Sequence, residues 1–535
     1  MAGFPGHGWA PSGPGVGVHG SVPDRFVPDA AGGGLPEGRP WLAIGLLIAL
    51  AWGLRAFGVA PGPFHENFHG YAALGLDPDS VPGSCGLGSP YLALMELLGA
   101  HGPALIAVNR VLSSLVVLPA VLVAADLLGG NLAGVLAGAV VAVHPLLARL
   151  GASEDPFAFY TLLLLSAAAL ARQAMREDRR ALLWLAAVLA SVAVWVRDST
   201  LVAGPVFVVL SLAPLPRRRW VEVSLACLVP VAAGVVRALC LHHGGAAVAL
   251  GEGASLLERA QAVAPWASVG ALRVLRTPAL FPALALGGFV LAAWRSPLAA
   301  LRLALALGLL QGPFAVALGT SFVSPFSSAR HLSPAVVLWT VPAGLLLARV
   351  VALVPPRRVL GRLDLRGVAA GLLLVATLAD APALLGDTSL PDREYPVMQR
   401  CLERLPEGAR VVPLDGGYAS HVAQQEAWYS RERPSWRPGN RNQTLDDAVS
   451  HRSTTAVLLI DHGCSVDATL PPTPDVSRAV EPSPWGPMVP ECARALGRPG
   501  WKTVLREDLT LDVAGRSLPV PVGCLIDQRP SAATP

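Results

Sequence analysis

Long apolar runs separated by short polar connections dominate the chain up to residue 381. A helix needs about 20 mostly apolar residues to cross the hydrocarbon core of a bilayer, so these runs predict about eleven transmembrane helices. They lie at residues 41–59, 104–128, 131–149, 157–174, 181–196, 200–215, 220–240, 277–294, 299–319, 332–351 and 367–381. The pattern therefore predicts an α-helical polytopic membrane domain over residues 41–381.

The pattern changes after residue 381. Apolar runs shorten to strand length in ARVVPL (409–414), TAVLLID (455–461) and PVPVGCLID (519–527), and a helical stretch at 392–405 precedes them. Strands that alternate with helices are typical of a small α/β domain. We therefore expect such a domain over residues 382–535.

The composition fits a membrane protein. Hydrophobic residues make up 53% of the chain and charged residues only 15%, whereas a soluble domain carries about 25% charged residues. The formal net charge of +4 is too small to indicate a nucleic-acid-binding protein. Residues 1–40 are rich in Gly and Pro and lack the apolar core of a signal peptide, so we expect a disordered tail there.

Arginine is concentrated in every second connection between the apolar runs. Short loops that are rich in Arg or Lys usually stay in the cytoplasm. With the tail also cytoplasmic and an odd number of spans, the remaining connections and the domain after residue 381 are predicted to be extracytoplasmic. We expect a multi-pass protein of the cell (inner) membrane. The Arg-rich connections are 172–180, 216–219, 294–302 and 355–366.

Four of the seven cysteines follow residue 381. In an oxidising exterior they would form two disulfides, with three connectivities open. Four buried free thiols are the alternative, and the sequence does not decide between them. The four are Cys401, Cys464, Cys492 and Cys524.

The first extracytoplasmic connection contains GPFHENFHGYAAL (62–74), with His65, Glu66 and His69 in the spacing H-E-x-x-H. Ionisable residues held near the depth of the bilayer are usually functional. Glu66 is therefore a candidate catalytic base, with His65 and His69 beside it. An interfacial polar loop without chemistry is the alternative.

A second acidic pair, Glu154 and Asp155, lies in the short connection GASEDP. Because Asp155 precedes Pro156, it could also cap a helix that begins there. That role would leave Glu154 unexplained. Arg197 and Asp198, in a later connection on the same face, could support the site, but we favour a structural role for them.

A third candidate motif is SSARHLSPAVVLW (327–339), in which Arg330 and His331 precede an apolar helix. A guanidinium can bind a phosphate through two hydrogen bonds. Arg330 would therefore suit an anionic lipid headgroup, with support from His331 or Arg110. A snorkelling arginine is the alternative for Arg330.

In order and spacing these three motifs resemble the GT-C superfamily of polyprenyl-phosphate-sugar-dependent glycosyltransferases, especially the protein O-mannosyltransferases and the lipid A aminoarabinose transferases. The similarity covers roughly residues 41–350. RAFGVAPGPFHENFHGYAAL (55–74) stands where the family has its first acidic motif, and Glu66 matches the motif's Glu. HPLLARLGASEDPFAFYTLLLL (144–165) and ARHLSPAVVLWTVPAGLLLA (329–348) are similar to the second acidic motif and to the late Arg-containing motif.

The resemblance implies an enzyme that moves a sugar from a polyprenyl-phosphate donor to a protein, lipid or glycan acceptor at the outer surface, with inversion. Such a transfer needs a carboxylate that takes the proton of the acceptor hydroxyl. It also needs cations that stabilise the departing lipid phosphate. Glu66 would be the base, and Arg330, His331 and Arg110 would hold the phosphate. His65 stands where the family usually has Asp, which leaves open whether a divalent cation is bound.

Two other classes of protein remain as alternatives. H-E-x-x-H is a zinc-ligand spacing, and LDG at 414–416 would complete an intramembrane metalloprotease. Both motifs, however, fall outside the apolar runs. A non-catalytic membrane binding or transport protein is the second alternative, although no internal repeat indicates a transporter.

Overall fold

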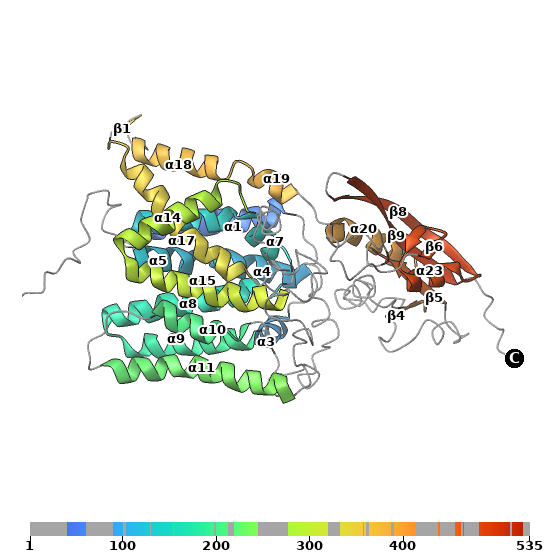
Figure 1. Cartoon of the computed structure of the whole chain (residues 1–535), viewed down its shortest axis with the longest axis horizontal. Coiled ribbons are helices and arrows are strands. Elements are labelled where there is room, and N and C mark those ends of the chain that lie inside the picture. Colours follow the sequence, from blue (N-terminus) through green and yellow to red (C-terminus); the bar gives the residue numbers. More distant parts are fainter. Residues whose placement is uncertain are drawn as a thin grey trace, which may run out of the picture. The chain divides into compact units, whose positions relative to one another are not determined.

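The computed structural model describes residues 40–59, 89–99, 103–128, 130–153, 155–196, 200–211, 219–243, 277–318, 332–356, 358–359, 363–386, 390–412, 437–438, 455–461, 464, 481–513 and 516–527. The predicted tail at 1–40 lies almost wholly outside the described residues. Helices occupy the first part of the chain and a mixed sheet the last (Figure 1).

Helices occupy all the apolar runs that the sequence singles out. The helix α8 (Phe157–Glu177), for example, covers the run predicted at 157–174. The others are α1 (Trp41–Gly53) with the π-helical turn η1 (Leu54–Gly58), α4 (Pro103–Leu115), α5 (Val117–Leu128), α6 (Asn131–Val143), α7 (Pro145–Gly151), α9 (Arg180–Trp195), α10 (Ala203–Ser211), α11 (Trp220–His243), α14 (Phe281–Arg295), α15 (Pro297–Leu318), α17 (Ser333–Ala352) and α18 (Leu365–Thr377). Two short helices, α3 (Pro90–Leu97) and α19 (Ala381–Gly386), lie outside those runs or at their edge.

The structure confirms the prediction of a helical membrane protein with several spans. Among the described residues, five helices are long and apolar enough to cross a bilayer, or six if the bent pair α6 and α7 counts as one span. Four shorter apolar helices accompany them. The exact number of spans therefore stays a prediction.

The outward faces of these helices are apolar. Large side chains lie exposed on α1, α11, α14 and α18, and Trp294 remains 86% exposed. Exposure of so many large apolar side chains would be unfavourable for a protein in water. Lipid tails would cover them at no such cost. Further examples are Leu42, Phe57, Val221, Leu228, Val290, Leu372 and Val375.

Between helices, small residues allow close approach. A Cβ added to Gly288 of α14 would lie 1.9 Å from the carbonyl oxygen of Pro342 in α17. A Cβ added to Gly344 of α17 would lie 2.5 Å from the carbonyl oxygen of Ala133 in α6. Membrane helices associate largely through such tight packing, because lipid offers no hydrophobic drive between them.

The run predicted at 131–149 is not one straight helix. It breaks at His144 into α6 and α7, which are bent by 58°. His144 has an extended backbone with ψ of 123°, and Pro145 opens α7. A residue that precedes proline disfavours the α conformation, which explains the break.

The last part of the chain contains a five-stranded sheet in the order β4-β3-β5-β9-β8. The strands β3 and β4 and the strands β3 and β5 are parallel, whereas β9 is antiparallel to both β5 and β8. The elements are α20 (Leu390–Glu403), β3 (Arg410–Val412), β4 (Arg437–Pro438), β5 (Ala456–Ile460), β6 (Glu481–Ser483), β7 (Gly486–Met488), α23 (Pro490–Gly497), β8 (Trp501–Val513) and β9 (Arg516–Asp527), besides the small pair β1 (Arg358–Val359) and β2 (Leu363–Asp364).

Side chains of β5 alternate between two apolar cores. Val457 and Leu459 pack with α20, whereas Leu458 and Ile460 pack with α23. Successive side chains of a strand point to opposite faces of the sheet, so both faces of β5 are covered. The sheet therefore supplies its own core, but the boundaries predicted for an independent domain stay a prediction.

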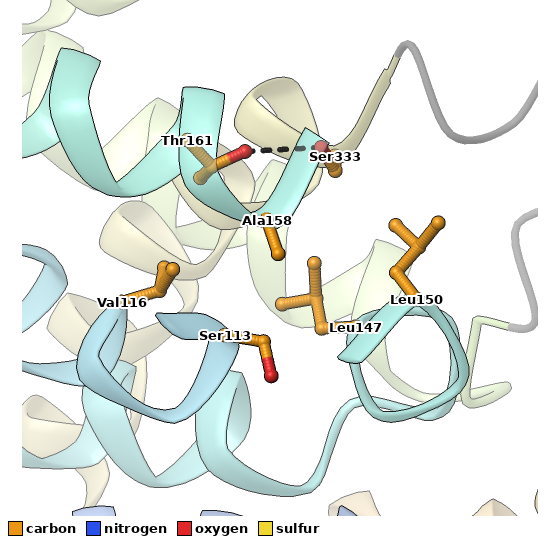
Figure 2. Close-up of a pocket in the computed structure, with 7 residues that line it drawn as sticks. All are labelled: Ser113, Val116, Leu147, Leu150, Ala158, Thr161 and Ser333. Atoms are coloured by element: carbon orange, nitrogen blue, oxygen red, sulfur yellow. Dashed lines mark hydrogen bonds between the residues drawn. The ribbon is translucent and has the colours of Figure 1, made fainter. Parts of the chain in front are cut away.

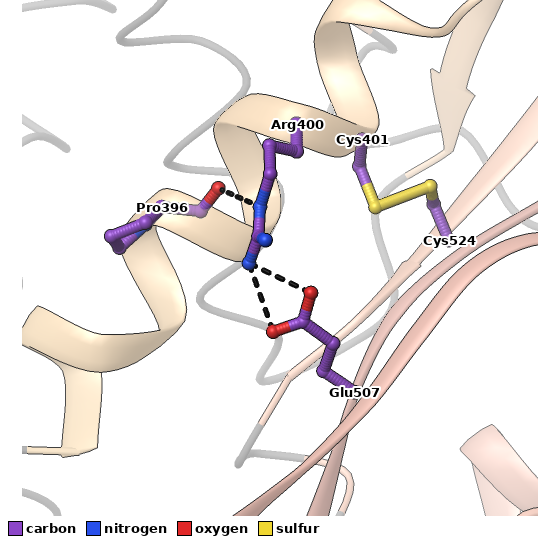
Figure 3. Close-up of a disulfide and its surroundings, with 5 residues drawn as sticks. All are labelled: Pro396, Arg400, Cys401, Glu507 and Cys524. Carbon is purple, nitrogen blue, oxygen red and sulfur yellow. Dashed lines mark hydrogen bonds and ion pairs between the residues drawn. A yellow bond between two sulfur atoms is a disulfide. The ribbon is translucent and has the colours of Figure 1, made fainter.

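Two disulfides hold helices to this sheet. Cys401 of α20 is bonded to Cys524 of β9, and Arg400 beside it pairs with Glu507 of β8 at 2.8 Å (Figure 3). Cys464 is bonded to Cys492 of α23. The free-thiol alternative is thus wrong, and one of the three connectivities is realised. Disulfides of this kind form in oxidising compartments.

Candidate active site

Most of the predicted site residues lie outside the described part of the chain. These are His65, Glu66, His69, Glu154, Arg197, Asp198, Arg330, His331 and the Asp415 of the LDG sequence. Arg110 and Asp155 are described. The roles given to the first set stay predictions, and the geometry below concerns the segments that lead into them.

Asp155 caps a helix. Its side chain is fully buried, and its Oδ1 accepts a hydrogen bond of 2.8 Å from the backbone N–H of Phe157 at the start of α8. An acidic side chain at a helix N-terminus satisfies a free N–H and complements the helix dipole. The capping interpretation of Asp155 is therefore confirmed. The functional roles of Glu154 and Asp155 in the second acidic motif stay predictions.

Asn109, which the sequence analysis missed, fixes the connection that carries this pair. It lies fully buried in α4, and its Nδ2 donates hydrogen bonds to the carbonyl oxygens of Ser153 at 2.7 Å and Asp155 at 2.8 Å. A third contact reaches the carbonyl oxygen of Leu150 at 3.4 Å. One amide thus holds both sides of Glu154. A single Asn inside the apolar run at 104–128 was the available signal.

A hydroxyl contact joins the second motif to the third. Thr161 of α8 and Ser333, the first residue of α17, lie with their hydroxyl oxygens 3.0 Å apart (Figure 2). They line a small chamber of about 10 Å³, roughly the room for one water. Ser113 of α4 lines the same chamber. Since Ser333 follows His331 by two residues, the third motif enters the fold beside the start of α8.

Arg55 of η1 joins the first motif to the second. Its guanidinium is fully buried, and Nη1 donates to the carbonyl oxygens of Ala51 and Ala142, each at 2.9 Å. Ala142 lies at the end of α6, just before the break at His144. The bond therefore ties the end of the first apolar run to the bent pair α6 and α7.

Apolar contacts also join the segment after Arg55 to α7. Val59, the last described residue before the loop that carries Glu66, packs against Ala148 and Ala152. Seven residues reach at most about 25 Å when fully extended. The contact therefore keeps Glu66 within that radius of the connection that carries Glu154.

Other buried polar groups surround the bent pair. His144 is fully buried with its ring 5.7 Å from that of Phe281, and neither ring nitrogen has a hydrogen-bond partner among the described residues. Arg149 of α7 is also buried, and Arg110 is half-buried. The sequence analysis assigned no role to His144, Arg149 or Arg55, although each interrupts an apolar run.

No group of three His, Cys, Asp or Glu side chains that could hold a metal ion occurs within the described ranges. The candidate ligands His65, Glu66 and His69 lie outside them. A bound divalent cation therefore stays an open prediction.

Comparison with known proteins gives structural neighbours only. No protein-family model matches the sequence, and no curated protein matches it. The apo structure of ArnT from Cupriavidus metallidurans is 15% identical with a TM-score of 0.52, over 93% of this chain and 99% of that one. The same protein bound to undecaprenyl phosphate gives 13% identity and a TM-score of 0.46, over 93% and 100%.

A second neighbour is the oligosaccharyltransferase of Archaeoglobus fulgidus in complex with zinc and sulfate. It is 12% identical with a TM-score of 0.46, and the match covers 78% of this chain and 68% of that one. Of these three structures, apo ArnT has a TM-score above 0.5, and at 15% identity its likeness shows a similar fold and nothing further.

Proposed function

This chain has the GT-C fold of ArnT, and from that premise we propose that it is an integral-membrane glycosyltransferase. It moves a sugar from a polyprenyl-phosphate donor to an acceptor hydroxyl on the outer face of the membrane. The fold match extends over almost the full length of both chains. The metalloprotease alternative is not favoured, because it has no support from the fold.

One observation carries the proposal beyond the fold. Three contacts, Arg55 with Ala142, Val59 with Ala148, and Thr161 with Ser333, anchor the three motif-bearing segments at the same end of the helices. Alternating membrane helices bring every second connection to one end, and these contacts bring three such segments, far apart in sequence, next to one another. A shared reaction centre explains the arrangement.

The chemistry gives the first motif the base and the third motif the phosphate contacts, and Glu154 and Asp155 of the second motif position the acceptor or the cations. Glu66 takes the proton of the acceptor hydroxyl, and the acceptor oxygen forms a bond to the anomeric carbon of the sugar. The bond from that carbon to the phosphate oxygen breaks, and its electron pair leaves with the polyprenyl phosphate. Arg330, His331 and Arg110 stabilise the growing negative charge. Attack on the face opposite the leaving phosphate inverts the anomeric carbon.

The proposal also includes an orientation. The arginine-rich connections favour a cytoplasmic location for the opposite end of the helices. The two disulfides of the sheet, and the disulfide-bonded Cys240 near the end of α11, favour an oxidising compartment for the residues that carry them. We infer that the motifs and the sheet are extracytoplasmic.

The direct test is Glu66→Gln, assayed for sugar transfer from polyprenyl-phosphate donors in purified, detergent-solubilised protein. Loss of a general base costs about 10²- to 10⁴-fold in rate, and we expect a loss of that size. Glu222→Gln is the matched control, because Glu222 pairs with Arg180 and Arg219 at the arginine-rich end. Full turnover by the Glu66→Gln variant would remove Glu66 as the base.

A further inference from the structure

Arg55 has an unusual hydrogen-bonding state for a buried cation. Its side chain is fully buried within an apolar helix, yet only Nη1 has partners, and both of these are neutral carbonyl oxygens. Nε and Nη2 have no hydrogen-bond partner among the described residues. An uncompensated buried charge is strongly destabilising. Such a group is retained in a membrane segment mainly where it serves a function.

Two other arginines whose side chains are largely covered, Arg172 and Arg219, are neutralised by carboxylates. Arg172 of α8 is paired with Asp126, and Arg219 is paired with Asp178 at 2.7 Å and with Glu222 at 3.6 Å. In the described part of the chain no carboxylate pairs with Arg55. Its missing counter-charge must therefore come from a group that is absent from this structure or from an undescribed part of the chain.

The free atoms of Arg55 also specify the shape of that group. Nε and Nη2 lie on one edge of the planar guanidinium, and their N–H bonds point in nearly parallel directions. This edge takes two oxygens of one carboxylate or one phosphate. A single halide or carbonyl oxygen would have to be shared by both donors, whereas two oxygens of one group give each N–H its own acceptor.

The free edge lies beside the end of α7. A Cβ added to Gly151 would come within 2.8 Å of Nε of Arg55 and within 2.1 Å of Oγ of Ser113. Because glycine has no Cβ, residue 151 leaves room for the side chain of Arg55. Because Glu154 follows Gly151 by three residues, the free edge lies next to the connection that carries the second acidic motif.

We propose that the Nε–Nη2 edge of Arg55 binds two oxygens of the phosphate group of the polyprenyl donor. This inference rests on the proposed transferase function. The donor is the anion that the reaction brings to this end of the helices. Its phosphate changes from a diester with one charge to a monoester with up to two as the sugar leaves. A fixed guanidinium in a water-poor site stabilises that added charge.

The test measures binding of undecaprenyl phosphate, which lacks the sugar, to the purified full-length protein. We expect wild-type protein to bind it. Arg55→Lys, which keeps the charge but loses the two-pronged donor, should bind roughly tenfold more weakly, and Arg55→Met at least about 100-fold more weakly. Arg237→Lys is the matched control. Arg237 is also a buried arginine, bonded to the carbonyl oxygen of Val194 and stacked on Trp195.

The outcomes separate this inference from the function it rests on. If wild-type and Arg55→Lys proteins bind the lipid equally while both remain folded by thermal melting, the phosphate assignment is overturned and the transferase proposal stands. A changed pH profile of turnover with unchanged lipid affinity would likewise overturn it, by assigning the edge to a carboxylate of the chain. If wild-type protein binds no polyprenyl phosphate and transfers no sugar, the proposed function itself fails. Should Arg55→Met not fold, the Lys variant decides.

Discussion

The two ends of the membrane helices treat buried charge in opposite ways. At one end, where α5 leads into α6, Asp126 is paired with Arg172 and Arg176. Nearby, Arg219 is paired with Asp178 and Glu222. We call this the Asp126 end. At the other end of α6, buried atoms of Arg55 and of other polar side chains lack partners among the described residues. These side chains are Asn109, His144 and Tyr160.

The difference between the two ends distinguishes charged residues that stabilise the fold from charged residues that have a functional role. At the Asp126 end carboxylates compensate the charge of the arginines, although Nε and Nη2 of Arg219 and one carboxylate oxygen of Glu222 have no hydrogen-bond partner among the described residues. Buried groups without partners are expensive, and each needs a reason in the native structure. We call the region around Arg55 the Arg55 end, where the proposed phosphate contact would supply the counter-charge that Arg55 lacks among the described residues.

The largest effect is expected from a substitution at the Asp126 end. Asp126→Asn leaves Arg172 buried without a counter-charge, and breaking such a pair should cost about 3 kcal/mol in the free energy of unfolding. Turnover per folded molecule should stay at the wild-type level. Denaturant unfolding in detergent, beside the transfer assay, measures both. Asp364→Asn, at an exposed cap of α18, is the control. A loss of turnover with stability preserved would place chemistry at this end as well.

A smaller effect is expected at the Arg55 end from Gly151→Ala. The new methyl group would overlap Ser113 and Arg55, and overpacking of this kind costs about 1–3 kcal/mol. Turnover should fall too, because the guanidinium is displaced. Gly45→Ala in α1 is the control, since a Cβ there meets no atom within 4 Å. Wild-type turnover in Gly151→Ala would show that the position of Arg55 is not required. Partial recovery in Gly151→Ala with Ser113→Gly would support the account.

The smallest effect is expected from Asn109→Ala. It removes the amide that holds the carbonyls of Ser153 and Asp155, at a cost of about 1–2 kcal/mol. The transfer rate should drop several-fold as the connection that carries Glu154 loosens. Asn109→Asp keeps the shape but cannot donate, so it should be no better than Ala. Ser191→Ala, which loses only a bond to Ala187 within its own helix, should leave the rate unchanged. Equal rates in all three variants would refute the role of Asn109.

Sequence reasoning found the membrane helices because their length is dictated by the bilayer. It missed the break at His144 even though the proline that follows is visible in the sequence. It also missed β8, because Arg506, Glu507 and Asp508 interrupt the apolar pattern. Pairing with β9 and contact with α20 hold that strand in place. Because two residues separate the end of β8 from the start of β9 and Val513 lies opposite Arg516, the pairing is that of a hairpin, and the signal was the short separation of the two strands rather than an apolar pattern in β8.

Sequence reasoning predicted the residues with candidate chemical roles but not the buried residues that hold their segments in place. Carboxylates and arginines near the ends of apolar runs stand out in a sequence. Asn109 and Arg55 interrupt apolar runs and so are visible in the sequence, but their partners are not, because these include backbone carbonyls of segments more than 40 residues away. The pairing of Cys401 with Cys524 likewise depends on the tertiary fold, since spacing alone allows three connectivities.

The account depends most on whether the acidic motifs meet. An experimental structure of the full chain with undecaprenyl phosphate bound would decide this directly. We expect the carboxyl groups of Glu66 and Glu154 to face one hollow, with the lipid phosphate between them and the free edge of Arg55. A structure with the two carboxyl groups at opposite ends of the helices, or with the phosphate bound at the Asp126 end, would contradict the account.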